Sequence, residues 1–496
     1  MGTRPLLVGL FCLLALTLLP SYASGQNAEI SGVVRDASGG VLPGVAVEAS
    51  SPALIEKART VFTDGQGQFR VIALQAGAYR VTFALAGFGT VIREGITLTS
   101  SFTATVNVTM SVGALQESVT VSGESPLVDV QTTSQKTALR TELLNELPTG
   151  RSFQNLAILV PGVQIPLSYG GDVGGSGGNL WQTMKIHGSR DDQMPLLLNG
   201  MPFNNMNNTG GGYNHTYSLN TGTTQEMTIT TSGSTPEART SGVVANTVSK
   251  EGGNRFNAYL FGEFSGSGLQ SNNLGSALKA QGLTAVNHIK QMYEINPTAG
   301  GPLIKDRLWF YGGYRGLLNT HYDANSYETI NPGAPQYCSN PSGCLYQGKL
   351  VPDSRNLTAQ DYAGDTFNRS ATLNLTWQIN TKNKANFFWH LTRRNLLNDS
   401  SVTQTPESSS YLYSNPDYIA QASWTNPVTS KFLLEAGATM ANETWWWVQR
   451  GWGPDQPRNY GILDGQDILN VTNAPPAWIV KYELANSTLY GANFVN

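Results

Sequence analysis

The sequence has few charged residues and few of the patterns that bind metals or phosphate. Only 13% of its 496 residues are charged, and 31 Lys and Arg nearly balance 34 Asp and Glu. This balance gives no electrostatic reason to expect nucleic acid as a partner. The five histidines are scattered without a His or Glu partner at a helical metal-binding spacing, and the Gly-x-x-x-x-Gly-Lys-Ser/Thr pattern is absent. We therefore expect no metal, no cofactor and no catalytic residue, in a protein that is not an enzyme.

Long apolar segments are also missing, except for one near the N-terminus. Arg4 precedes an apolar run over residues 6–19, and small residues follow at 23–25. This order is typical of a secretory signal peptide, and about 14 apolar residues are fewer than the roughly 20 that span a bilayer as a helix. We predict a signal peptide over residues 1–25, and hence an exported protein.

What the sequence has in abundance is turn residues and short alternating segments. It contains 53 Gly and 24 Pro, and its length allows about three domains. Residues 79–85 and 102–110 alternate apolar with polar positions, as strands with one buried face do. Further strands are expected at 30–35, 45–48, 60–63, 68–73 and 96–98. We predict a β-sandwich domain over residues 26–112.

The motifs within this segment are specific. They lie at residues 31–36, 42–47, 63–69 and 77–81. Together they closely resemble the carboxypeptidase regulatory-like domain, which implies a carbohydrate-binding-like sandwich fold. That domain lacks the catalytic zinc site of the peptidases, so the resemblance implies no peptidase activity.

The middle of the chain predicts a mixed α/β domain over residues 141–255, after a linker at 113–140. Leu143, Leu144 and Leu147 mark one face of a short helix, and Asn199-Gly200 is the strongest two-residue signal for a β-hairpin. Motifs follow in order at residues 147–151, 161–163, 186–190, 198–202, 237–250 and 251–256. The ordered set resembles the plug of a TonB-dependent outer-membrane transporter, and with the preceding sandwich it resembles the Oar-like branch of that family.

Residues 256–496 carry the weak signature of transmembrane β-strands. Candidate strands of about ten residues alternate in polarity, aromatic residues crowd their ends, and the segment 300–311 resembles the early barrel hairpin of Oar-like transporters. Polar stretches at 265–296 and 322–365 are expected to be extracellular loops. A soluble β-protein with exposed aromatics is the alternative. The predicted fold class is thus mainly β: a sandwich, an α/β plug and the first part of a transmembrane barrel.

About seven strands are too few for a closed barrel around a plug. Plugged barrels use 22 strands, which need about 440 residues at roughly 20 per strand, and only 241 residues follow Arg255. An open sheet in lipid would leave two edges of unpaired backbone groups, at a cost of about tens of kcal/mol. We therefore interpret the chain as an N-terminal fragment; a prematurely stopped gene product is the alternative.

The resemblance implies energised uptake of a ligand across the outer membrane, driven by a TonB-type energy-transducing complex that rearranges the plug. The resemblance also implies a short extended TonB-contact segment ahead of the plug. Its best local match is Glu117, Ser118, Val119, Thr120 and Val121, although these residues could equally end the sandwich or link it to the plug. The barrel would contact outer-membrane lipid, and the sandwich would lie in the periplasm. An outer-membrane-anchored surface binding or adhesion protein with a carbohydrate-binding-like module is the alternative function.

Two further sets of residues are candidate sites. Trp181, Tyr213 and Tyr217 could stack on a carbohydrate ligand, or could simply order a loop. Cys338 and Cys344 are expected to close a small disulfide loop rather than hold a metal, because an exported chain meets an oxidising compartment.

Overall fold

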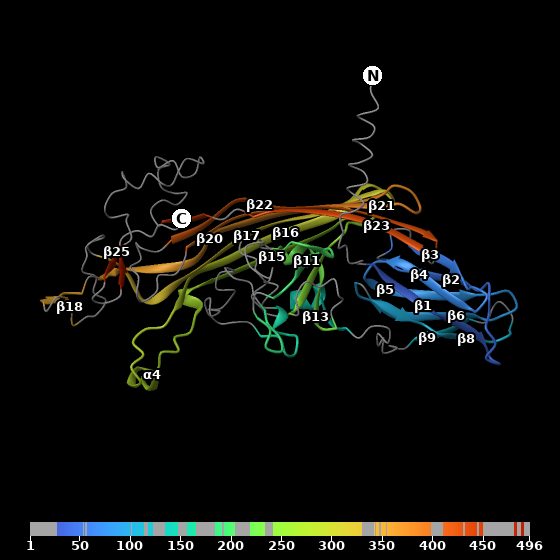
Figure 1. The fold of residues 1–496 in the computed structure, drawn as a ribbon, viewed down its shortest axis with the longest axis horizontal. Helices are drawn as coiled ribbons and strands as arrows, with labels where there is room; N and C mark the ends of the chain where they lie inside the picture. Colours follow the sequence, from blue (N-terminus) through green and yellow to red (C-terminus); the bar gives the residue numbers. More distant parts are fainter. Residues whose placement is uncertain are drawn as a thin grey trace, which may run out of the picture.

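The protein was analysed in a computed structural model, in which three β-rich parts lie along an elongated molecule (Figure 1). The structure describes residues 27–52, 54, 57–100, 102–113, 118–122, 134–146, 156–164, 184–190, 193–203, 219–233, 242–329, 342, 344–346, 349–353, 355–397, 410–429, 432–443, 446–449, 481–483 and 488–490. The predicted signal peptide lies outside these residues. Among the described residues, no helix is both long enough and apolar enough to cross a membrane.

The N-terminal part is a sandwich of two sheets, as predicted. One sheet joins β1 (Ala28–Asp36) to β4 (Gln68–Leu74), β7 (Thr103–Thr105) and β8 (Val108–Met110). The other has the order β3 (Ala58–Phe62), β2 (Ala46–Ser50), β5 (Gly77–Ala84), β6 (Thr90–Leu98) and β9 (Ser118–Ser122). The alternating apolar residues of both sheets meet in one core, where Phe69 and Phe83 pack edge to face with ring centroids 5.4 Å apart.

Two sandwich strands differ from their sequence prediction. The segment 102–110 forms two strands, β7 and β8, which both pair in parallel with β1. At the break between them, the side-chain oxygen of Asn107 accepts a hydrogen bond from the backbone N–H of Val33 at 3.0 Å. The strand predicted at 96–98 is the nine-residue β6. Its polar residues Arg93 and Glu94 interrupt the apolar alternation, so the sequence predicted only the last three residues of this strand.

In its described residues, the plug is a five-stranded sheet with little helix. Its order is β10 (Gln135–Arg140), β13 (Thr224–Ser232), β14 (Val244–Ser249), β11 (Leu196–Leu198) and β12 (Met201–Pro202), and α2 (Thr141–Glu146) follows β10 directly. A short 3-10 turn, η2 (Thr221–Thr223), precedes β13. The apolar core of the plug takes in two side chains of the neighbouring sheet, Phe388 and Ile419, so the plug is packed against that sheet.

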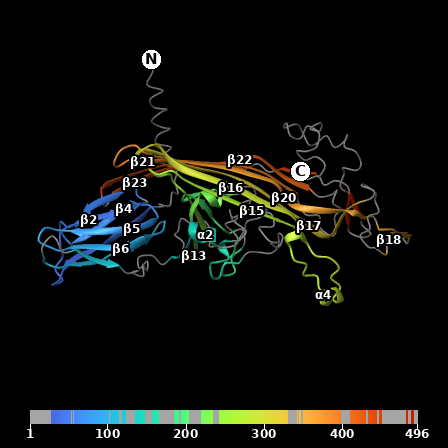
Figure 2. The same cartoon turned by 180° about the vertical axis from the view of Figure 1, so that it is seen from behind.

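A long antiparallel sheet, called the wall below, runs past both other parts (Figures 1 and 2). Its strands are β15 (Asn257–Gly266), β16 (His288–Ile304), β17 (Leu308–Thr329), β20 (Arg355–Gln378), β21 (Lys384–Leu397), β22 (Ser410–Thr429) and β23 (Phe432–Asn442), and β24 (Trp446–Gln449) pairs with β22. Two small hairpins form separate sheets: β18 (Cys344–Tyr346) with β19 (Lys349–Val351), and β25 (Lys481–Glu483) with β26 (Thr488–Tyr490). η3 (Ser267–Leu269) and α4 (Ser276–Ala280) lie between β15 and β16 along the chain. No sheet among the described strands closes on itself, which confirms the predicted partial barrel.

The wall has its polar side chains inside and many apolar side chains outside. Along β16, Glu294 and Asn296 are buried, whereas Tyr293 and Ile295 between them are 39% and 50% exposed. Phe387 on β21 is also 43% exposed, beside the fully buried Phe388. This order is the reverse of a soluble sheet and is typical of a sheet whose outer face meets lipid.

The same reversal explains why two predicted loops were too long. β16 begins at His288, inside the predicted loop 265–296, while β17 and β20 occupy both ends of the predicted loop 322–365. The sequence predicts loops in these segments because their residues are polar. Several of them, such as Glu294 and Asp323, are instead buried strand residues on the inner face of the wall.

Candidate functional site: the polar contacts that hold the plug

The hairpin between β11 and β12 carries one contact between the plug and the wall. Asn199 and Gly200 have φ of 52° and 72°, the positive angles of a two-residue type I′ turn, so the predicted hairpin is confirmed. The Asn199 side-chain oxygen accepts hydrogen bonds from the N–H and the hydroxyl of Ser249, each at 2.9 Å. Its amide nitrogen donates to Oε1 of Gln421 on β22 at 3.1 Å. Gln421 Nε2 in turn donates to the carbonyl of Leu198 at 2.9 Å, so the hairpin and the wall are linked in both directions.

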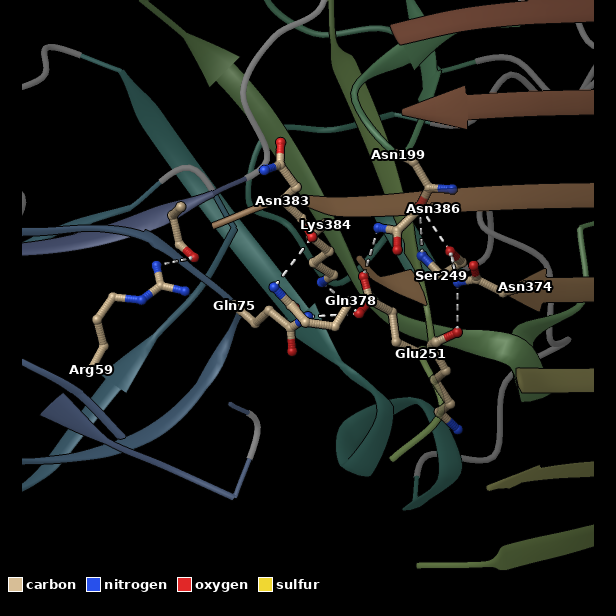
Figure 3. A network of polar contacts seen from close by, with 12 residues as sticks. Arg59, Gln75, Asn199, Ser249, Glu251, Asn374, Gln378, Asn383, Lys384 and Asn386 are labelled. Atoms are coloured by element: carbon tan, nitrogen blue, oxygen red, sulfur yellow. Dashed lines mark hydrogen bonds and ion pairs between the residues drawn. The ribbon is translucent and has the colours of Figure 1, made fainter. Parts of the chain in front are cut away.

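Glu251, two residues after β14, joins all three parts of the molecule (Figure 3). Its Oε2 accepts from Gln75 Nε2 of the sandwich at 2.6 Å and from Lys384 Nζ of the wall at 2.8 Å. Its Oε1 accepts from Asn386 Nδ2 of the wall at 3.0 Å. The side chains of Lys384 and Glu251 are 21% and 22% exposed, so water screens this ion pair only in part. These four residues are called the Glu251 cluster below.

A second, fully buried set of contacts lies at η2. The side-chain oxygen of Asn220 accepts from Asn296 Nδ2 of the wall at 2.7 Å and from the N–H of Gly222 at 2.8 Å. Asn296 also donates to Glu294 Oε1 at 3.2 Å, and Arg315 Nη2 pairs with Glu294 Oε2 at 2.8 Å. The Arg315 and Glu294 side chains are 4% and 1% exposed. A buried ion pair of this kind fixes a geometry more than it adds stability.

A cavity of about 1230 Å³ lies where the sandwich, the plug and the wall meet. Its lining includes Arg59 and Glu94 of the sandwich, Glu251 and Arg255 after the plug, and Lys384 of the wall. No group of three or more His, Cys, Asp or Glu that could hold a metal occurs in the described part of the chain. The arrangement is suited to holding and releasing a domain through polar contacts.

The TonB-contact candidates lie partly in the structure. Ser118, Val119, Thr120 and Val121 belong to β9, which pairs in parallel with β6 at the edge of the sandwich sheet. Glu117 lies outside the described residues. The backbone of this segment is therefore extended, as strand addition requires, and the segment is also a strand of the sandwich.

The other candidates lie largely outside the described residues. Trp181, Tyr213, Tyr217 and Cys338 fall there, so the proposed stacking and the proposed disulfide stay predictions. Cys344 is the first residue of β18.

The structure assigns contacts to residues that the sequence did not single out. Glu251 belongs to the plug motif at residues 251–256, but the motif assigns it no contact. No sequence pattern indicated that Gln75 or Lys384 would bind it. Their hydrogen bonds to Glu251 span 176 and 133 residues of chain. No local pattern could have paired them, whereas the conformation of Asn199-Gly200 was readable from two adjacent residues.

Two domain families match the chain. Residues 29–111 match the carboxypeptidase regulatory-like domain, and residues 129–255 match the TonB-dependent receptor plug domain. The TonB-dependent transporter Oar of Myxococcus xanthus is 30% identical over 308 residues. That alignment covers 60% of this chain and 27% of Oar, so the chain spans about a quarter of the length of this relative.

Solved structures of an outer-membrane transporter and of a siderophore receptor are similar to the chain at low identity. The outer membrane transporter YddB of Escherichia coli is 15% identical with a TM-score of 0.43, over 62% of this chain and 39% of YddB. The siderophore receptor PirA of Pseudomonas aeruginosa is 14% identical with a TM-score of 0.31, over 62% of this chain and 50% of PirA. The predicted resemblance is confirmed by the domain matches and by Oar: the chain carries a carboxypeptidase regulatory-like domain followed by the plug domain of the TonB-dependent receptors.

Proposed function

We propose that this chain acts in energised import of a ligand across the outer membrane, in which a TonB-type complex rearranges the plug against the wall. The observation that carries the proposal is the polarity of the plug–wall boundary. The inner face of the wall buries many more polar than apolar side chains, among them Asn296, Asn374, His390, Thr392 and Gln421. Several of them hydrogen-bond directly to the plug.

A polar boundary suits a domain that must move. A hydrogen bond within the protein contributes only about 0.5–1.5 kcal/mol net, because water replaces the partner when the bond breaks. Large apolar faces would instead resist separation in proportion to the area exposed, at roughly 25 cal/mol per Å². Phe388 and Ile419 are the wall residues in the apolar core of the plug. Because they are only two side chains, separating the plug from the wall exposes little apolar area at this core.

The TonB-contact segment is proposed to be β9. It is the last strand in its sheet order, so among the described strands one of its edges has no neighbour. An extended partner segment could add there through main-chain hydrogen bonds, which place little demand on sequence. In this proposal the sandwich lies in the periplasm, the outer face of the wall contacts lipid, and the imported ligand is a molecule such as a carbohydrate.

The experiment is site-specific cross-linking in cells that express the gene encoding this chain. A photoreactive residue at Thr120 is expected to cross-link to TonB in energised cells, and the yield should fall when a protonophore collapses the proton-motive force. Val119→Pro removes a main-chain donor from β9 and should abolish the cross-link. Val119→Thr keeps the donor and a β-branched side chain and is the matched control.

Absence of a TonB cross-link in the unaltered protein would contradict the proposal. Surface binding of cells or glycans that is indifferent to the protonophore would then favour the adhesion alternative. Loss of the cross-link in Val119→Thr as well would show that the side chain at this position, and not the main chain, carries the contact.

A further inference from the structure

We infer that the cavity between the sandwich, the plug and the wall binds an acidic carbohydrate, a ligand that carries several carboxylate groups beside its hydroxyls. The inference rests on the proposed function and adds to it the chemical class of the imported ligand. In that function the sandwich lies in the periplasm, so the cavity is on the periplasmic side of the plug. A ligand released from the plug meets this cavity before it leaves the protein.

The lining of the cavity carries an excess of positive charge. Among the described residues it contains seven Lys and Arg against three Glu, whereas the whole chain has a formal net charge of -3. Three of the basic residues come from the sandwich, and the others come from the wall and from the segment just after the plug. A cleft lined by one sign of charge concentrates ligands of the opposite sign and raises their rate of association by about 10- to 1,000-fold. The excess therefore favours an anion.

Three of the basic side chains have no partner of their own. Glu94 pairs with Arg80 of the sandwich. Glu251 pairs with Lys384 of the wall. Within the described part of the chain, no hydrogen bond or ion pair is made by the side chains of three exposed lining residues, Lys57, Arg255 and Lys305. Their charges are available to a ligand.

The cavity already holds one carboxylate, that of Glu251 (Figure 3). Its two oxygens accept hydrogen bonds from Gln75 of the sandwich and from Lys384 and Asn386 of the wall. Lys384 and Asn386 are two residues apart on β21, so their side chains are on the same face of the strand. Donors from two separate parts of the molecule thus converge on one carboxylate. A ligand carboxylate requires the same donors, so Glu251 competes with the ligand for them.

Neutral side chains of the lining suit the hydroxyls of a carbohydrate. Asn374 and Asn386 both line the cavity, and each has a buried side-chain oxygen without a hydrogen-bond donor in the described part of the structure. Asn374 is only 4% exposed. An amide oxygen accepts and cannot donate, and a buried acceptor without a donor is unfavourable. A ligand hydroxyl supplies that donor, whereas a carboxylate does not.

The size of the cavity indicates more than one sugar unit. Its volume of about 1230 Å³ exceeds the roughly 300–1,000 Å³ of pockets for drug-sized ligands. Basic residues line it on both sides, with Arg59 on the sandwich and Lys382 on the wall. Arg59 Nη1 donates to the carbonyl of Ile72 at 2.6 Å, which holds the guanidinium at the lining. A ligand with carboxylates on successive sugar units reaches both sides at once.

Equilibrium dialysis of the purified full chain in detergent tests the inference. The probes are trigalacturonate, a trisaccharide with one carboxylate on each sugar, and maltotriose, a neutral trisaccharide of similar size. At low salt we expect trigalacturonate to bind about 10-fold more tightly than maltotriose, because each carboxylate gains a partly exposed ion pair. Raising the salt concentration should weaken the binding of trigalacturonate, because salt screens exposed charges.

Two variants change the charge of the cavity in opposite directions. The double variant Arg255→Gln, Lys305→Gln removes two unpaired cations and should weaken trigalacturonate binding by about 5-fold. Glu251→Gln removes the competing carboxylate and should strengthen binding by a similar factor, which misfolding cannot imitate. Lys279→Gln is the matched control. It makes the same change at an exposed lysine of α4, outside the cavity lining and at the end of the molecule away from the sandwich (Figure 1).

Equal binding of the two trisaccharides, or no binding of either, would overturn the inference. So would a double variant that binds trigalacturonate as Lys279→Gln does, or a Glu251→Gln variant that binds no more tightly than the unaltered chain. None of these measurements involves TonB or the proton-motive force. Their failure would leave the cross-link at Thr120 untouched, whereas absence of that cross-link would contradict the proposed function and not the binding site.

Discussion

Replacing Glu251 by alanine is expected to loosen the plug from the sandwich and from the wall at once. The change removes the acceptor for three donors, Gln75 at 2.6 Å, Lys384 at 2.8 Å and Asn386 at 3.0 Å. Among the described residues, none of these three donor atoms has a second acceptor, so each must turn to water or lose its bond. The variant therefore tests whether polar contacts hold the plug in place.

The size of the effect follows from burial and charge. A hydrogen bond to a charged group contributes about 1.5–3 kcal/mol when buried, and an exposed ion pair only about 0–1 kcal/mol. Glu251 and Lys384 are each about one-fifth exposed, and their contributions are coupled and not additive. We expect Glu251→Ala to lower the free energy of plug unfolding by roughly 2–4 kcal/mol, and Glu251→Gln by about half as much.

Urea unfolding of the plug within the full chain measures this change. A fluorophore on Ile158→Cys reports the plug, because Ile158 is 63% exposed; Cys338 and Cys344 are replaced by serine in this background. At about 1–3 kcal/mol per molar urea, the expected loss moves the midpoint down by about 1–2 M. Glu48→Ala removes an exposed carboxylate of the sandwich and should leave the midpoint unchanged.

A double-mutant cycle with Lys384→Met isolates the ion pair. We expect the two replacements to be less than additive, by about 0.5–1.5 kcal/mol. A midpoint shift below about 0.3 M in Glu251→Ala, or full additivity with Lys384→Met, would refute the view that this cluster secures the plug.

Two other replacements probe the buried and the exposed charges. Arg315→Met removes the buried ion pair between Arg315 and Glu294 and should destabilise the plug–wall assembly by about 3–5 kcal/mol. Combining it with Glu294→Met should recover most of that loss in the same urea assay, and an equal or larger loss in the double variant would contradict the pairing. The hydroxyl of Ser38, followed by backbone N–H groups of the same turn, holds the pKa of Asp36 below its usual 3.8. The stability that Asp36 contributes to the sandwich is therefore fully present above pH 3.8 and is lost as the pH falls through the lowered pKa. Thermal melts of the sandwich should accordingly become less acid-sensitive in Asp36→Asn, and an unchanged pH dependence would remove this role.

The sandwich and the plug hairpin were predictable because their signals are local. In the sandwich, apolar residues two apart on one strand face the same core, so alternation in the sequence becomes burial in the fold. Asn199-Gly200 predicted its turn because few other residue pairs adopt two successive positive φ angles without strain. Interactions between neighbours in sequence decide both features.

The wall strands were only partly predictable, because their inner face is defined by what lies against it. Glu294, Asn296 and Asp323 look like loop residues in the sequence, yet the plug side of the wall buries them in β16 and β17. Polarity indicates solvent exposure only when nothing polar covers the residue. Here the covering domain comes from another part of the chain.

The sequence by itself determined the domain types, their order and the family resemblance, since these depend on short motifs and on local periodicity. Only the tertiary structure decided which residues hold the domains together. The partners of Glu251 lie 176, 133 and 135 residues away along the chain. Ser100 and Glu226, which form a hydrogen bond with each other, are 126 residues apart. The physical reason is that a hydrogen bond depends on distance in space, and packing of separate sheets brings together atoms whose separation along the chain carries no pattern.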